Sequence, residues 1–385
     1  MIDIMFSREE LYFRDQVRAF MKAQIEPEVE KFQQEKTYPR PLIEKIGKAG
    51  YNGALHDQAY GGTKKGAVYE CIVAEEVGKI FPALDLSRLV STVFFGMPLG
   101  KFGTAKQKET YLPGIVSGAK IGAIGITEPD VGSDAAGMKT KAVKQENHYV
   151  INGEKRFITN GSQADFILVF AITDPNVKSH KGMSAFIVEK GTPGFEAISD
   201  FKLMGMECAR VSYLKFKDVK VPAENLLGSE NKGFQILMDE LDCERTTLAA
   251  EAVGYAQFPF DQALKFSNER EQFSQKIRMF EGVNFKIADM VTKLEASRLL
   301  VLLAARMIDS GNSATKEASM AKIFATESAV EVADLALQIQ GGHGYTKDSM
   351  VERYYRDARL MRIGGGTGEI VRYLLQREVY KTYGL

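Results

Sequence analysis

The stretch between about residue 121 and residue 226 constrains the fold most, because it carries several apolar runs with no helical segment between them. The run "ARVSYLKFKDVKVP" (209–222) alternates apolar and polar residues with a period of two, as a half-buried strand does. Four further runs of this kind are "IGAIGIT" (121–127), "HYVINGEKRFIT" (148–159), "DFILVFAIT" (165–173) and "MSAFIVE" (183–189). Strands that follow one another without crossover helices predict an antiparallel barrel or sandwich and not a doubly wound sheet.

The regions on either side of this stretch have a helical pattern. Near the N-terminus, Ser7 is the expected helix cap, and Glu10 completes a capping box. After the stretch, long helices are expected at 231–268, 280–310, 314–341 and 368–382. Pro259 lies inside the first of these, and an interior proline removes a helical hydrogen bond. We therefore expect a bend near Phe258.

The chain has 385 residues, which is too long for one ordinary core. We expect an α+β protein with three parts, namely an N-terminal α-helical domain (1–120), a middle antiparallel β domain (121–230) and a C-terminal helical domain (231–385). In the middle part, "ING" (151–153) predicts a hairpin, because Asn-Gly supplies the positive φ of a type I′ turn. No GxGxxG motif occurs, which argues against a dinucleotide bound in the Rossmann manner.

Charge and apolar pattern exclude several classes of function. With 50 basic and 50 acidic side chains, the chain has no overall footprint for nucleic acid or an anionic membrane. Its longest apolar run, "LLVLLAA" (299–305), is far shorter than the roughly 20 residues that span a bilayer. The N-terminus lacks the pattern of a signal peptide. Three cysteines without CxxC spacing and four scattered histidines predict no zinc site, and we expect a cytoplasmic location.

Several short stretches look unusual for a pure scaffold, although each alone is explained at least as well by a turn or a helix cap. They are "GITEPDVGSD" (125–134), "KRFITNG" (155–161), "NEREQF" (268–273) and "QIQGGHGY" (338–345). In this order, and together with "LDCERTTLAAEAVGYAQ" (241–257) and "RDARLMRIGGGTGEI" (356–370), they resemble the acyl-CoA dehydrogenase family of flavoproteins. The resemblance covers nearly the whole chain, from "GYNGALHDQAYGG" (50–62) to the last helix.

The resemblance implies an N-terminal helical domain, a middle β domain and a C-terminal four-helix bundle, with FAD in the cleft between them and a homotetramer as the assembly. Carried over by position, the residues that contact the flavin are Ile126, Thr127, Ser133, Phe157, Thr159, Thr367 and Glu369. A neighbouring subunit would contribute Arg270, Phe273, Gln338, Gly341 and Gly342 to the diphosphate and adenine side. The implied substrate contacts are Ser133, Asp242 and Arg245. Phe157 stands where members often have tryptophan, and phenylalanine keeps a flat ring that can stack.

The glycine turn at 364–366 lacks the carboxylate that acts as the base in the reaction of this family. The reaction removes a proton from Cα of an acyl thioester with a carboxylate, and hydrogen-bond donors stabilise the enolate oxygen. Many relatives place the glutamate directly before the Gly-Thr pair, where this chain has Gly365. Isovaleryl-type and long-chain-type relatives supply it from the first helix of the C-terminal domain, just before an arginine. We therefore expect Glu244 as the base, with a pKa raised by burial, Arg245 as a substrate anchor and the N–H of Gly365 as an oxyanion donor.

The expected reaction converts an acyl-CoA into a 2-enoyl-CoA and passes electrons to an electron-transferring flavoprotein. In the segment 85–99, Asp85 is the only acid, and Ser91, Thr92, Phe94 and Phe95 have the character of pocket lining. The two phenylalanines favour short, branched or cyclic acyl groups, although core packing explains them equally well. Three alternatives remain open, namely an enoyl-CoA reductase, an acyl-CoA oxidase that uses the same site, and a non-catalytic acyl-CoA-binding member of the family.

Overall fold

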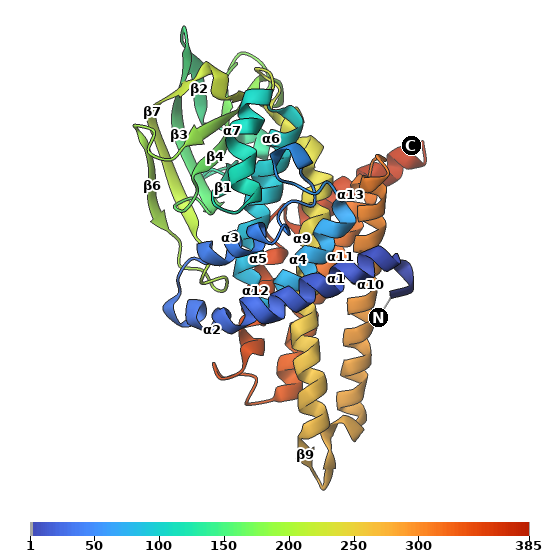
Figure 1. The fold of residues 1–385 in the computed structure, drawn as a ribbon. Coiled ribbons are helices and arrows are strands. Elements are labelled where there is room, and N and C mark those ends of the chain that lie inside the picture. Colours follow the sequence, from blue (N-terminus) through green and yellow to red (C-terminus); the bar gives the residue numbers. More distant parts are fainter. Residues whose placement is uncertain (1–2, 385) are drawn as a thin grey trace.

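The computed structural model describes residues 3–384 and arranges them as a helical part, a β-sheet and a second helical part (Figure 1). The first part contains α1 (Arg8–Phe20), α2 (Glu26–Glu35), α3 (Arg40–Lys48), α4 (Ala67–Ile80), α5 (Pro82–Leu89), α6 (Gly96–Phe102) and α7 (Ala105–Val116). Single stretches of π-helix, η2 (Met21–Ile25) and η4 (Val90–Phe95), join α1 to α2 and α5 to α6. The predicted capping box is confirmed, since Ser7 and Glu10 each accept a hydrogen bond from the other's backbone N–H.

The middle part is a curled sheet of eight strands. They are β1 (Gly122–Gly125), β2 (Lys141–Lys144), β3 (His148–Thr159), β4 (Phe166–Ile172), β5 (Met183–Glu189), β6 (Phe195–Asp200), β7 (Val211–Pro222) and β8 (Leu226–Leu227). Their order is β6-β7-β3-β2-β4-β5-β8, and β1 pairs with β4. Most pairs are antiparallel, as predicted, but β1 and β2 both run parallel to β4.

The hairpin predicted at Asn152-Gly153 is wrong. β3 runs through this pair, and the turn that joins β2 to β3 lies earlier, where the N–H of Gln145 bonds to the carbonyl of His148 at 2.8 Å. The register of β3 with β7 shifts at Asn152-Gly153, and a Cβ on Gly153 would overlap with the side chain of Thr140. Glycine here allows a bulge and the close approach of a neighbouring strand. Because glycine is also favoured in tight turns, the same residue pair indicated a hairpin.

The sheet has an apolar core on each face. Along β4, Leu168 and Phe170 belong to a core shared with η4, α7 and the start of α9, whereas Ile167 and Val169 face a second core. This second core also contains side chains of β5 and β7, so the sheet curls over itself. β4 is apolar throughout because both of its faces are buried, whereas β7 alternates apolar and polar residues.

The last part is a bundle of long helices, in agreement with the expected α+β fold. It contains α9 (Gly233–Glu269), α10 (Glu281–Asp309), α11 (Thr315–Gln340), α12 (Met350–Met361) and α13 (Gly368–Thr382). The four predicted helices are confirmed. α12 is an additional helix that was not predicted, because most of its residues are polar or charged and only a narrow face is apolar. α9 continues through Pro259, and the bend near Phe258 stays a prediction. A short hairpin, β9 (Glu271–Gln272) and β10 (Gln275–Lys276), joins α9 to α10 at the far tip of the molecule (Figure 1).

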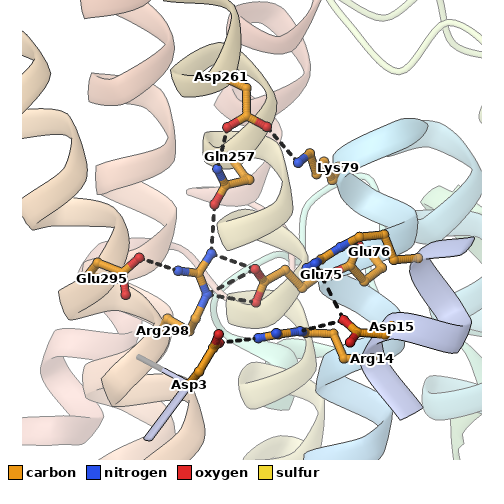
Figure 2. A network of polar contacts seen from close by, with 11 residues as sticks. Asp3, Arg14, Asp15, Glu75, Glu76, Lys79, Gln257, Asp261, Glu295 and Arg298 are labelled. Atoms are coloured by element: carbon orange, nitrogen blue, oxygen red, sulfur yellow. Dashed lines mark hydrogen bonds and ion pairs between the residues drawn. The ribbon is translucent and has the colours of Figure 1, made fainter. Parts of the chain in front are cut away.

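One apolar core joins the two helical parts, and polar contacts reinforce it. Arg298 of α10 donates hydrogen bonds to Glu75 of α4 at 2.6 and 3.0 Å and to Gln257 of α9 at 2.9 Å (Figure 2). Gln257 bonds to Asp261 at 2.7 Å, and Asp261 pairs with Lys79 of α4 at 2.6 Å (Figure 2). These contacts hold α4 and α9 in a fixed relation, and α9 carries the candidate base.

Candidate active site

Glu244 of α9 and Gly365, in the turn between α12 and α13, lie against each other. A Cβ atom built on Gly365 would lie 3.2 Å from Oε1 of Glu244, and it would overlap with Cδ1 of Leu248. The carboxyl group of Glu244 therefore reaches the space beside position 365 from another helix. The two positions that the sequence singled out meet in the fold, and the role of Glu244 as a base remains a proposal.

The carboxyl group of Glu244 is buried and has no hydrogen-bond partner among residues 3–384. The residue is 7% exposed. Burial raises its pKa to about 7, and the positive charges of Arg245 and Lys322 oppose that rise. A carboxyl group with this pKa is partly ionised near neutral pH and can accept a proton from a bound molecule.

The glycine turn beside Glu244 is held by backbone hydrogen bonds despite its unusual conformation. Gly365 and Gly366 have φ angles of 64° and 93°, which side chains with a Cβ rarely adopt. The N–H of Gly364 bonds to the carbonyl of Leu360 at 3.0 Å, and the N–H of Gly368 bonds to that of Arg362 at 3.1 Å. The N–H of Gly365 donates no backbone hydrogen bond within residues 3–384 and can serve a ligand.

Thr367 and Glu369 follow the turn at the start of α13. Thr367 caps this helix by accepting a hydrogen bond from the N–H of Ile370 at 3.3 Å. Glu369 is exposed, and bonds from its own backbone N–H and from Thr367 lower its pKa. Both residues lie next to the glycine turn, so they can contact a flat molecule bound against it.

The neighbours of Glu244 on α9 have different surroundings. Arg245 is 3% exposed, its Nε has no hydrogen-bond partner in the described chain, and burial lowers its pKa. Such a buried, unpartnered donor suits the anchoring of a polar ligand group. Asp242 accepts a hydrogen bond from Thr315 of α11 at 2.9 Å, so at least one of its oxygens is already engaged.

The loop after β1 carries another set of expected cofactor contacts, and a buried ion pair sets its position. Glu128 pairs with Lys155 of β3 at 2.9 Å and accepts bonds from the N–H groups of Lys139 and Thr140 at 2.7 and 3.0 Å. Lys155 also donates to the carbonyl of Ile126 at 3.1 Å. Ile126 is thereby fixed at the end of β1.

Phe157 is the most unusual residue of this set. It is 54% exposed, has a φ of 58° and lies at a second bulge of β3 against β7. Its ring centroid lies 4.7 Å from that of Phe201. A positive φ in a bulky residue is strained, and such strain persists where surroundings or function require it. Nearby, the carbonyl of Thr127 accepts a bond from the N–H of Arg156 at 2.8 Å, Thr159 ends β3, and Ser133 is exposed.

The remaining expected cofactor residues gather at the tip of the long helices. Arg270 lies between the end of α9 and β9, and Phe273 lies in the turn of the β9–β10 hairpin, where it is 90% exposed and has a φ of 52°. The end of α11 lies near the base of this hairpin, because His343 stacks on Phe266 with ring centroids 6.0 Å apart. Three exposed residues at that end are Gln338, Gly341 and Gly342.

These two sets fit a flavin dinucleotide, but one chain does not bring them together. An exposed, strained aromatic ring can stack on a flat ring system, and a Cβ built on Gly341 or Gly342 would meet no atom within 4 Å, which leaves room for close approach. Figure 1 shows the sheet and the hairpin at opposite ends of the molecule. A cofactor that used both sets would therefore need a second copy of the chain.

Sequence reasoning missed three residues beside Glu244. Leu248 touches position 365, and Lys322 of α11 donates a hydrogen bond to the carbonyl of Gly366. Glu240, one turn before Glu244, is 7% exposed, and its pKa is raised by burial and then by the charge of Glu244. Leu248 and Glu240 lie four residues from Glu244, a spacing that places them on the same helix face. Lys322 lies in a distant segment, so no spacing rule could find it.

The segment 85–99 packs as core more than as pocket lining. Phe95 is 1% exposed, and its ring lies against Phe166, with ring centroids 6.2 Å apart. Ser91 accepts a hydrogen bond from the N–H of Gly122 at 2.9 Å. Phe94 is 9% exposed and belongs to the core of the two helical parts. Core packing is thus the explanation that holds for Phe95.

Within residues 3–384, no group of three or more His, Cys, Asp or Glu side chains could hold a metal ion. No helix of that part of the chain is long and apolar enough to cross a membrane.

Three family models match the chain in the order of its three parts. They are the N-terminal domain of acyl-CoA dehydrogenase (residues 7–119), its middle domain (123–219) and its C-terminal domain (231–380). The chain therefore belongs to the acyl-CoA dehydrogenase family. It is an oxidoreductase that acts on the CH–CH bond of acyl-CoA thioesters, as the named enzymes of this family do.

Curated relatives match over almost their full length. The chain is 41% identical over 382 residues to the acryloyl-CoA reductase (NADH) of Anaerotignum propionicum, covering 99% of this chain and 96% of the relative. It is 40% identical over 365 residues to the cyclohex-1-ene-1-carbonyl-CoA dehydrogenase of Geobacter metallireducens, covering 94% and 96%. The mitochondrial isovaleryl-CoA dehydrogenase of Arabidopsis thaliana is 37% identical over 380 residues, covering 98% and 93%.

Solved structures match the fold equally well. Butyryl-CoA dehydrogenase from Megasphaera elsdenii matches with a TM-score of 0.94 and 36% identity, covering 97% of this chain and 98% of that one. A chain in a structure described as the electron transferring flavoprotein of Acidaminococcus fermentans has the same TM-score and coverage and 39% identity. The FAD complex of PigA matches with a TM-score of 0.94 and 28% identity, again covering 97% and 98%.

Proposed function

We propose that this enzyme oxidises an acyl-CoA to a 2-enoyl-CoA with Glu244 as the base and FAD as its cofactor. One observation carries the proposal. The carboxyl group of Glu244 is buried, unpartnered among the described residues and placed against Gly365, where many relatives carry their catalytic glutamate. A buried carboxyl group without a partner is costly to keep in a fold, and a function that needs it free explains its presence.

Glu244 removes a proton from Cα of the thioester in this proposal. The Cα–H electron pair then forms a double bond to Cβ as a hydride leaves Cβ. FAD, when bound, accepts this hydride. The pKa of Glu244, about 7, keeps a useful fraction of the base ionised and makes it a stronger base than an ordinary carboxylate.

The glycine turn and Arg245 position the substrate. The N–H of Gly365 donates a hydrogen bond to the thioester oxygen, where negative charge develops as the proton leaves. A turn with φ angles of 64° and 93° presents backbone groups that a side chain would cover. Arg245, whose Nε has no partner in the described chain, anchors a polar group of the bound substrate.

The substrate class that we propose is a short, branched or cyclic acyl-CoA. Three matched relatives act on such groups by their names, which are acryloyl, isovaleryl and cyclohex-1-ene-1-carbonyl. Leu248, next to both Glu244 and Gly365, is in a position to limit the space for the acyl group. Phe95 does not contribute to this limit, because it packs in the core.

We further propose an electron-transferring flavoprotein as the electron acceptor, on the basis of the matched chain in the Acidaminococcus fermentans structure. A second candidate is the reverse reaction, reduction of an enoyl-CoA, because a relative with 41% identity is an acryloyl-CoA reductase. The same base then returns its proton to Cα. An oxidase that uses the same site completes the alternatives.

We also propose that the enzyme is a homotetramer in which a neighbouring copy supplies Arg270, Phe273 and the end of α11 to the FAD site. The separation of the two expected sets of cofactor residues in one chain supports this (Figure 1). The division into domains at residues 120 and 230 and a cytoplasmic location remain proposals from the sequence.

Flavin bleaching tests these proposals directly. The FAD-loaded enzyme is mixed without air with butyryl-CoA, isovaleryl-CoA and cyclohexanoyl-CoA, and the loss of flavin absorbance is followed. The proposal requires rapid bleaching by at least one ester in the wild type and almost none in Glu244→Gln. No bleaching by any ester contradicts the dehydrogenase proposal. Reoxidation rates with oxygen, with electron-transferring flavoprotein and with acryloyl-CoA then separate oxidase, dehydrogenase and reductase.

A further inference from the structure

Lys322 on α11 is buried as completely as an apolar core residue. Its exposed fraction is 0%, although lysine normally keeps its ammonium group in water. Burial, and after it the charge of Arg245, lower its pKa to about 8. Burying a cation at such a position costs free energy unless hydrogen bonds and nearby charges stabilise it.

The partner of Lys322 is the backbone of the glycine turn. Its Nζ donates a hydrogen bond to the carbonyl of Gly366. The other bonds within the turn, from Gly364 to Leu360 and from Gly368 to Arg362, bind its two ends and leave its centre to this contact. Lys322 thus connects α11 to the centre of the turn.

Charged groups of three helices face the Lys322 ammonium group. They are Glu244 and Arg245 on α9, Glu369 on α13 and Glu327 on α11 itself. Its positive charge in turn lowers the pKa of Glu244. Lys322 therefore binds the glycine turn by a hydrogen bond and acts on Glu244 through its charge.

We propose that Lys322 is a positioning residue, which holds the glycine turn so that the N–H of Gly365 faces the thioester oxygen while its charge favours the ionised form of the nearby base. This rests on the proposed function, because it assigns roles to Glu244 and Gly365. A cation near the thioester oxygen also favours the enolate that forms there. A lysine that only filled space would affect neither the polarisation of the substrate nor the titration of the base.

The test compares Lys322→Met with Lys316→Met in the FAD-loaded enzyme. Lys316 lies on the same helix, is half-buried with 39% of its side chain exposed, and pairs with Glu317, so its replacement controls for the loss of a lysine. With butyryl-CoA, we expect Lys322→Met to lower kcat about 10- to 100-fold, less than the loss of a direct oxyanion donor. KM should change less than about threefold. The limb of the kcat profile that reports the base should move to higher pH, because a cation that favours its ionisation is gone.

A second readout does not depend on proton transfer. Difference infrared spectra of bound acetyl-CoA, labelled with carbon-13 at the carbonyl, measure polarisation of the thioester C=O bond. Acetyl-CoA has no Cβ hydrogen and cannot complete the reaction. We expect the C=O stretch to shift to higher frequency in Lys322→Met and to stay unchanged in Lys316→Met. Unchanged kcat, pH limb and C=O stretch in Lys322→Met, with loss of stability alone, would overturn the proposal.

Two further variants separate the possible failures. If Glu244→Gln keeps its turnover, the proposed base is wrong, whereas the C=O stretch of Lys322→Met still tests the turn. If Lys322→Met does not fold, Lys322→Gln removes the charge and keeps a polar donor. In that variant the pH limb should still move upward, and an unmoved limb contradicts the electrostatic role of Lys322.

Discussion

Glu244 and Glu251 lie two turns apart on α9 and are both buried, yet their surroundings differ. Glu244 has no hydrogen-bond partner in the described chain and lies against the glycine turn. Glu251 is 0% exposed and contacts the hydroxyl of Tyr255, which also lies 3.0 Å from the carbonyl of Pro82. Because that hydroxyl has a single proton, a protonated Glu251 that donates to Tyr255 satisfies both contacts. Burial and the nearby charge of Asp85 raise the pKa of Glu251 accordingly.

A buried ionic cluster continues from Glu251 into the first helical part. Arg88 of α5 is 0% exposed and pairs with Asp85 at 2.7 Å and with Glu70 of α4 at 2.6 Å. The contacts of this cluster join α4, α5 and α9, although Oδ2 of Asp85, Nη2 of Arg88 and Oε2 of Glu251 have no hydrogen-bond partner in the described chain. Burial raises the pKa of both glutamates, but one oxygen of Glu251 is engaged by Tyr255, whereas neither oxygen of Glu244 has a partner in the described chain and the group lies against the glycine turn.

Removing each carboxylate in turn tests whether catalysis depends on Glu244 and not on Glu251. Glu244→Gln should lower turnover with the best acyl-CoA by about 10²–10⁴-fold, the range for loss of a general base. Glu251→Gln, the matched variant on the same helix, should keep most of the activity. Steady-state kinetics and anaerobic flavin bleaching measure both. Equal losses in the two variants would mean that α9 geometry, and not the Glu244 base, controls the rate.

Replacing Arg88 tests whether the buried ionic cluster around it stabilises the fold. Arg88→Met leaves Asp85 and Glu70 without their buried cation and should lower the free energy of unfolding by about 3–5 kcal/mol. Urea unfolding measures this change. The control is Lys106→Met, which removes an exposed ion pair with Glu224 and should have little effect. A small effect of Arg88→Met would show that the cluster is not needed to join the helices.

The pH dependence of the free energy of unfolding tests the raised pKa of Glu244. Its pKa is about 7 in the fold and near 4.5 in the unfolded chain, so the folded state binds the proton more tightly. Its ionisation therefore destabilises the fold as pH rises from about 4.5 to 7. Glu244→Gln should be more stable than the wild type by at most about 3 kcal/mol at pH 8, with no gain at pH 4. Urea unfolding of the ligand-free holoenzyme checks this, and a gain independent of pH contradicts it.

The smallest effect concerns the turn. Gly365→Ala should lower the free energy of unfolding by about 1–2 kcal/mol, because φ is 64° and a Cβ would overlap with Leu248. Gly364→Ala is the control, since its φ is not positive and its Cβ would meet only the carbonyl of Leu360, at 3.9 Å. Thermal unfolding of both variants measures the difference. Equal stability of the two would show that the turn relaxes around a side chain.

Much of the fold follows from local patterns in the sequence. The apolar run of β4, the period of two in β7, the capping box at Ser7 and the four long helices are all found where the residues indicate them. These features depend on neighbours within a few residues, which a sequence displays directly. The hairpin at Asn152-Gly153 failed because a bulge and a turn need the same glycine, and only the partner strand decides between them.

The site divides in the same way. The sequence displays a glycine where a base is expected and a Glu-Arg pair elsewhere, and these residues define the chemistry in question. The approach of Glu244 to Gly365, the bond from Lys322 to the turn and the pKa of about 7 exist only in the packed molecule. Contacts between distant segments and the loss of water around a carboxyl group both arise when helices pack. No local pattern in the chain records either of them.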